Sequence, residues 1–113
     1  MTEIIIEKEL GEGVSEVLTE KITGYLKCVI LSCDNFINFG LYLNDFKDII
    51  LFESSDFRLL GQYYLPLRLI PKNLEGEIFN FANVEWCLND NLLIQLQGKA
   101  GTKVKIVLRY EEY

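Results

Sequence analysis

The chain has 113 residues, half of them apolar, and its eleven basic and seventeen acidic side chains give a formal charge of −6. This length allows one domain around one hydrophobic core, so residues 1–113 are expected to form a single domain. Nucleic acid is excluded as a partner, because phosphate binding needs clustered positive charge and the basic residues here are scattered. The apolar content is high for so small a domain, which favours an oligomer or a larger assembly.

The sequence also argues against catalysis, metals and cofactors. It contains no histidine, and therefore lacks the usual general base near neutral pH and the commonest zinc ligand. Cys28, Cys33 and Cys87 form no CxxC pair and are expected to be free, buried thiols. No signal peptide and no apolar run long enough to cross a membrane are recognised, so we expect neither secretion nor membrane insertion. The sequence thus predicts a protein that is not an enzyme and needs no cofactor.

The first third of the chain predicts strands, with one ambiguity. Glu3 to Glu9 alternates, with Ile4 and Ile6 on one side and glutamates on the other, although Ile5 breaks the pattern. Residues 14–23 fit either one short helix or two strand segments, and the β-branched residues favour strands.

The middle of the chain is rich in apolar runs. Tyr25 to Cys33 predicts a strand covered on both faces, Asp34-Asn35 breaks it, and Ile37 to Leu43 predicts another strand. Four apolar residues at 49–52 cannot all face one core from a strand. Either Ile50 and Phe52 or their two neighbours must be covered by something outside the core. A turn is expected at 53–56.

The segment from Phe57 to Ile70 supplies the other candidate interface residues. It contains Gly61 and Pro66, so it is expected at a sheet edge or in an irregular crossing. Tyr63, Tyr64 and Arg68 are the side chains that protein interfaces use as anchors. The same residues could instead stack on a sugar, or the tyrosines could cap the core. Residues 77–87 alternate again, and Trp86 is expected in the core.

The last third predicts a β-hairpin with one buried face. Apolar residues alternate with polar ones over 92–97 and again over 103–110, and a connection with glycines at 98 and 101 lies between them. A loop with this spacing followed by a strand is not a nucleotide-binding loop. Strands separated by turns at intervals of about ten residues predict an all-β fold, an antiparallel sandwich or jelly roll of about eight strands.

Three segments resemble a known family. They are Gly24 to Ile30 at the opening of a strand, Gln62 to Arg68, and the ending from Leu92 to Glu111. From about Ile22 onward the chain resembles small β-sandwich structural proteins of tailed bacteriophages, which decorate capsids or are accessory pieces of the head or tail. The resemblance implies a virion protein assembled in the host cytoplasm, whose partners are copies of itself or a phage capsid or tail protein. The segments 49–52 and 57–70 depart from the family pattern, and no functional residue is carried over from it.

Overall fold

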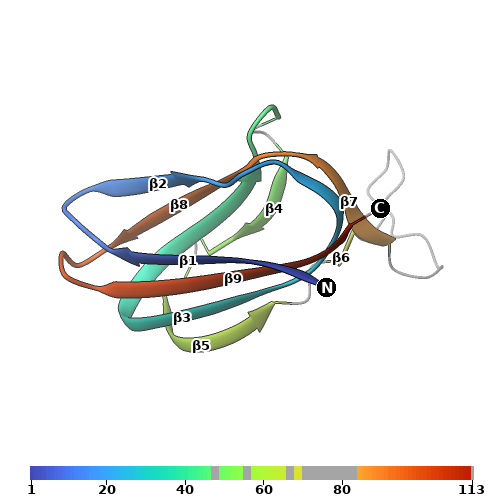
Figure 1. Ribbon diagram of the computed structural model, residues 1–113. Coiled ribbons are helices and arrows are strands. Elements are labelled where there is room, and N and C mark those ends of the chain that lie inside the picture. The colour runs from blue at the N-terminus through green and yellow to red at the C-terminus, as the bar shows by residue number, and fades with distance from the viewer. Residues whose placement is uncertain (47–48, 55–56, 66–67, 70–83, 113) are drawn as a thin grey trace, which may run out of the picture.

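The computed structural model describes residues 1–46, 49–54, 57–65, 68–69 and 84–112. Within these ranges the chain forms nine strands and no helix (Figure 1), so the predicted all-β fold is confirmed and residues 14–23 are strands rather than a helix. The strands are β1 (Thr2–Glu9), β2 (Val14–Leu18), β3 (Ile22–Leu43), β4 (Ile50–Glu53), β5 (Leu59–Leu65), β6 (Arg68–Leu69), β7 (Val84–Asp90), β8 (Leu92–Gly98) and β9 (Lys103–Glu112).

The 22-residue strand β3 organises the whole sheet. Its first part, residues 22–33, pairs with β9 on one side and with β5 and β7 on the other. After a register shift between Cys33 and Ile37, its second part pairs with β8 and β4. The break predicted at Asp34-Asn35 is therefore a bend within one strand. The Asp34 carboxylate accepts a hydrogen bond from the Lys103 amide at 2.9 Å there, which ties the bend to the start of β9.

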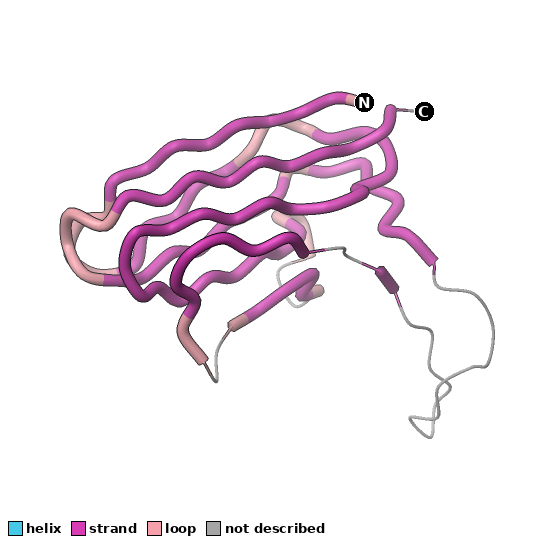
Figure 2. Tube along the Cα trace, turned by 90° about the horizontal axis from the view of Figure 1, so that it is seen from below, coloured by secondary structure: helices cyan, strands magenta, loops and turns pink. Residues whose placement is uncertain are grey.

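The bend in β3 divides the sheet into two facing layers. We call β1, β9, residues 22–33 of β3, and β5 wing 1, and we call β2, β8, residues 37–43 of β3, and β4 wing 2. Figure 1 shows the wings opposite each other, and the turned view of Figure 2 shows the strands of wing 1 side by side. The hydrogen bonding continues from one layer to the other through β3, so the fold is one curled sheet, and the finer prediction of a sandwich or jelly roll is not confirmed.

The two strands of the predicted C-terminal hairpin, β8 and β9, are present, but they do not pair with each other. β8 pairs with β2 and β3, whereas β9 pairs with β1 and β3, so the last two strands lie in different wings. The loop between them crosses from one wing to the other beside the loop that joins β1 to β2. Leu10 links the two crossings, because its amide donates to Thr102 and its carbonyl accepts from Gly101, both at 2.8 Å. The alternation of apolar and polar residues indicates which face of each strand is buried. It does not distinguish between the two wings, because a strand in either wing has one buried face.

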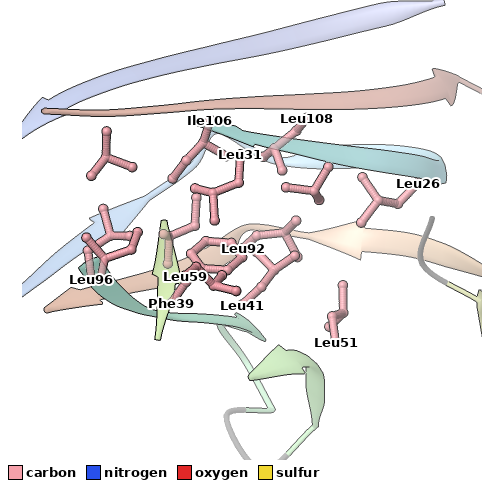
Figure 3. Close-up of a cluster of buried hydrophobic side chains, with 14 of the residues drawn as sticks. Leu26, Leu31, Phe39, Leu41, Leu51, Leu59, Leu92, Leu96, Ile106 and Leu108 are labelled. Carbon is pink, nitrogen blue, oxygen red and sulfur yellow. The ribbon is translucent and has the colours of Figure 1, made fainter. Parts of the chain in front are cut away.

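The core lies between the wings and is filled mainly from β3, β8 and β9 (Figure 3). Its fully enclosed side chains include Leu31, Phe39, Leu41, Ile94, Leu96, Ile106 and Leu108. Cys28 and Cys33 are buried and none of the three cysteines forms a disulfide, but Cys87 is exposed, so the expectation of buried cysteines is wrong for that residue. Residues 70–83, most of the predicted 77–87 strand, and the Trp86 side chain lie outside the described part of the chain.

Candidate interface

The three anchor candidates near β5 do not form one cluster. Tyr63 is half-buried against the core, and its hydroxyl accepts a hydrogen bond from the Leu60 amide at 3.2 Å. Tyr64, the next residue, points to the opposite face of the strand and is 64% exposed. Arg68 lies in β6, where its backbone pairs with Glu85, and its side chain is outside the described residues. The two tyrosines therefore do not share a surface on which a ligand could stack.

The apolar segment at β4 is divided by a bulge. Leu41 pairs with Phe52 and Tyr42 pairs with Ile50, so Leu51 is an extra residue without a partner in the ladder. A bulge lets two successive residues turn the same way. Leu51 is buried in the core, and Phe52 packs beside it with its ring 5.8 Å from that of Phe39. Ile50 is left on the outer face with 49% of its surface exposed. Of the two candidates in this segment, only Ile50 remains available to a partner.

The outer face of wing 1 carries a continuous apolar row. Ile5 of β1 pairs with Val107 of β9, Val107 pairs with Ile30 of β3, and Ile30 pairs with Tyr64 of β5. We call these four residues row 1. Their neighbours along each strand face the core, whereas Ile5 is 57% exposed and Val107 and Ile30 are partly exposed. Row 1 thus crosses all four strands of the wing on its solvent side.

Charged pairs flank row 1 on both sides. Towards one end of the strands, Arg109 donates to Glu3 at 2.8 Å. Towards the other end, Lys105 lies 4.0 Å from Glu7. All four side chains are well exposed, so these ion pairs add little to stability. They frame an apolar strip with a polar rim, which is the anatomy of a protein interface.

The outer face of wing 2 carries a second apolar row. Leu18 of β2 pairs with Leu93 of β8, Leu93 pairs with Tyr42 of β3, and Tyr42 pairs with Ile50 of β4. We call these four residues row 2. Leu18 is 55% exposed, Tyr42 is partly exposed, and Leu93 is buried beneath its neighbours. Row 2 therefore lies on the side of the molecule opposite row 1.

The polar line beside row 2 differs from the lines beside row 1. Glu16 accepts a hydrogen bond from the Gln95 amide at 3.3 Å, and Glu53 accepts one from the Tyr42 hydroxyl at 3.1 Å. Gly40 separates these pairs, and a side chain there would overlap the Tyr42 ring, which lies across the glycine. Burial raises the pKa of Tyr42, and the hydrogen bond to Glu53 and its negative charge raise it further. This line carries carboxylates without an opposing cation.

Sequence reasoning found one member of each row and missed the others. The sequence singles out Tyr64 and Ile50. Ile5 is noticed only as a break in the alternation of residues 3–9, Ile30 lies in a strand expected to be covered on both faces, and Val107 is not singled out. The available signal was the broken alternation: an isoleucine or valine at each of these positions stands where a half-buried strand would place a polar residue. Recognising the rows also required the strand pairing, which aligns these exceptions across neighbouring strands.

The rest of the surface offers little for chemistry. A shallow depression of about 500 Å³ at the loop end of wing 1 is lined by side chains of both charges, among them Glu7, Asp34 and Lys103. No group of residues in the described ranges could hold a metal ion. Burial raises the pKa of the Cys33 thiol, whose Sγ lies 3.5 Å from the Leu59 carbonyl oxygen, so this thiol is not an activated nucleophile.

Among the residues that the structure places, no helix is long and apolar enough to cross a membrane. No protein-family model, curated protein or solved structure matches this chain.

Proposed function

We propose that the chain is a non-enzymatic structural protein that acts by protein–protein assembly, in the virion of a tailed bacteriophage. Its partners there are copies of itself, a capsid protein or a tail protein, with decoration of the capsid or an accessory place at the head or tail as its role. The observation that supports this proposal is the pair of apolar rows on opposite outer faces, rows 1 and 2.

The driving force would be burial of apolar side chains that the fold leaves outside. Covering such surface is worth about 25 cal/mol per Å², reduced by the cost of association. Scattered exposed apolar residues are normal on a soluble protein, but residues aligned across a whole sheet make a contiguous patch. A module with one such patch on each side can contact two neighbours at once, which suits a component of an ordered shell or tube.

The phage setting comes from the resemblance of the segments at 24–30, 62–68 and 92–111 to virion structural proteins. The absence of histidine from the chain also favours a structural role over a hydrolytic one. A sugar-binding site, by contrast, would need aromatic and polar groups converging on one surface, and Tyr63 and Tyr64 point to opposite faces.

The proposal is tested by placing a charge in row 2. We expect Ile50→Asp to fold normally, because the side chain is 49% exposed, and to lose attachment to virions, because a carboxylate would be buried without a partner. The chain is produced during infection by a phage that encodes it, and its copy number is measured in particles purified on a density gradient.

Phe36→Asp is the matched control, because Phe36 is 50% exposed and belongs to neither row. It should remain in the particles at the wild-type level, and both variants should keep the wild-type unfolding midpoint. Absence of the wild-type chain from purified particles would overturn the virion role. Retention of Ile50→Asp at the wild-type level would show that row 2 is not an attachment surface.

A further inference from the structure

We infer that row 1 is covered by row 1 of a second copy, in a face-to-face dimer whose twofold axis runs parallel to the strands. This inference rests on the proposed assembly function and names the partner of one of its two surfaces. It follows from the way in which the charges beside row 1 meet under the two twofold axes that lay row 1 onto itself.

Two sheets that stack face to face are related by an axis lying in the plane between them. If that axis ran along row 1, each strand would lie over itself and the two flanking lines would exchange places. Glu3 would then face Glu7 of the second copy, and Arg109 would face Lys105 of the second copy. Each contact sets like charges against each other as they are being desolvated, which is strongly unfavourable.

The axis parallel to the strands gives a different result. It places β1 over β5 of the second copy and β9 over β3 of the second copy, because row 1 runs in the order β1, β9, β3, β5. Ile5 then packs on Tyr64 of the second copy, and Val107 packs on Ile30 of the second copy.

The charged residues meet neutral ones in this second arrangement. Lys105 faces Ser32 of the second copy, because those two residues are paired across β9 and β3 within one chain. In the same way, Glu7 faces Gln62 of the second copy, and Arg109 lies over the register position of Cys28, whose own side chain is only 2% exposed. Each ion pair stays within its own copy. Apolar residues therefore meet apolar residues, and neither Lys105 nor Glu7 is set against a like charge.

The other surfaces do not pair with themselves in this way. On wing 2, the axis parallel to the strands would set Glu16 against Glu53 of the second copy, since β2 would lie over β4. At the edge strand β1, the antiparallel registers centred on Ile5 or Ile6 would set Glu3 against Glu7 or Glu9 of the second copy. Like charges directly opposite each other disfavour such pairing. Pairing of row 2 with itself about this axis is thus disfavoured.

The size of the face indicates a reversible dimer. Four strands at about 4.8 Å spacing and eight residues at about 3.3 Å rise cover about 500 Å² per copy, or about 1,000 Å² for the pair. That is close to the lower limit for a specific interface. We therefore expect dimerisation that depends on protein concentration.

Thiol cross-linking tests the axis. In a Cys87→Ser background, which removes the exposed thiol, the double variant Ile5→Cys/Tyr64→Cys is treated with a bismaleimide whose reach matches the spacing of about 10 Å between stacked sheets, and is analysed on a denaturing gel. We expect most of the double variant to run at twice the 13.1 kDa of one chain, and Ile5→Cys alone to stay monomeric. Within one copy, positions 5 and 64 are three strands or about 14 Å apart, and a cross-link between them would leave the mass at that of one chain.

Efficient trapping of Ile5→Cys alone would overturn the inferred axis, because it would place Ile5 on Ile5 of the second copy. Failure of both variants to form the covalent dimer would overturn the dimer itself.

A second measurement needs no new thiol. Sedimentation equilibrium over a wide concentration range should show the wild-type mass rising towards that of a dimer. Ile5→Asp should remain a monomer, and Leu18→Asp, its match in exposure on row 2, should dimerise like the wild type. If Leu18→Asp were monomeric and Ile5→Asp dimerised, the assignment of the dimer contact to row 1 would be overturned. If the chain never dimerises but is recovered in virions, the dimer is overturned and the proposed function stands. If the chain dimerises but is absent from virions, the proposed virion role is overturned and the dimer stands.

Discussion

The pKa of the Tyr42 hydroxyl depends on the folded structure. Its ring lies across Gly40 and its hydroxyl donates to Glu53 at 3.1 Å. Burial first, and then the bond to Glu53 and its charge, raise the pKa of Tyr42 in the folded protein. Glycine at position 40 is what makes room for this arrangement, and a residue with a side chain there would displace the ring from row 2.

This raised pKa predicts a loss of stability at alkaline pH. The unfolded chain releases the phenolic proton at about pH 10 and the folded chain holds it to higher pH, so above about pH 10 the unfolded state binds fewer protons. The free energy of unfolding should therefore fall as the pH rises through the folded pKa, and the contribution should be fully present below pH 10. Urea unfolding of Tyr42→Phe should show a shallower decline than the wild type. Some decline remains, because burial also raises the pKa of Tyr110. Equal slopes for the two proteins would contradict this account.

At the scale of the strand, Gly24 has the tightest backbone approach among the glycines of the described residues. It lies where β3 is flanked by both β7 and β9, and a Cβ there would overlap the backbone carbonyl oxygen of Glu111. Gly24→Ala should thus push β9 away from β3 and lower the free energy of unfolding by about 1–3 kcal/mol. Gly11→Ala is the matched control, because a Cβ at Gly11 meets nothing within 4 Å. Chemical denaturation of both variants provides the measurement, and equal stabilities would refute the steric argument.

The elements also show where sequence reasoning succeeds and where it stops. Alternation predicted β1, β8 and β9 and their buried faces, because side-chain direction in a strand is a local property. It did not predict that β8 and β9 lie in different wings, since the choice of neighbour is decided by how β3 bends. The turn expected at 53–56 likewise gave no sign that Ser54 would be buried. Ser54 is fully buried, and its hydroxyl accepts a hydrogen bond from the Phe39 amide at 2.8 Å. The candidate surfaces were half found for the same reason: outward apolar residues can be recognised along a strand, but rows cannot be recognised before the strands are paired.

For the whole molecule, the charge pattern predicts how the dimer responds to salt. The inferred contact joins apolar residues and leaves each ion pair within its own copy, so the two copies are not held together by opposite charges. Between about 50 and about 500 mM salt, dimerisation should not weaken, and screening of the formal charge of −6 that each copy carries should strengthen it. Sedimentation equilibrium at several salt concentrations checks this. A steep weakening with salt would indicate ion pairs between the copies and a different interface.

The bend in β3 has a mechanical consequence. The two outer faces belong to layers built on one uninterrupted stretch of backbone, and that stretch is hydrogen-bonded to five other described strands. A pull applied between neighbours seated on opposite faces would therefore be carried by the main chain and its ladders, not by side-chain contact alone. The layers of such a module cannot slide apart as two independent sheets could.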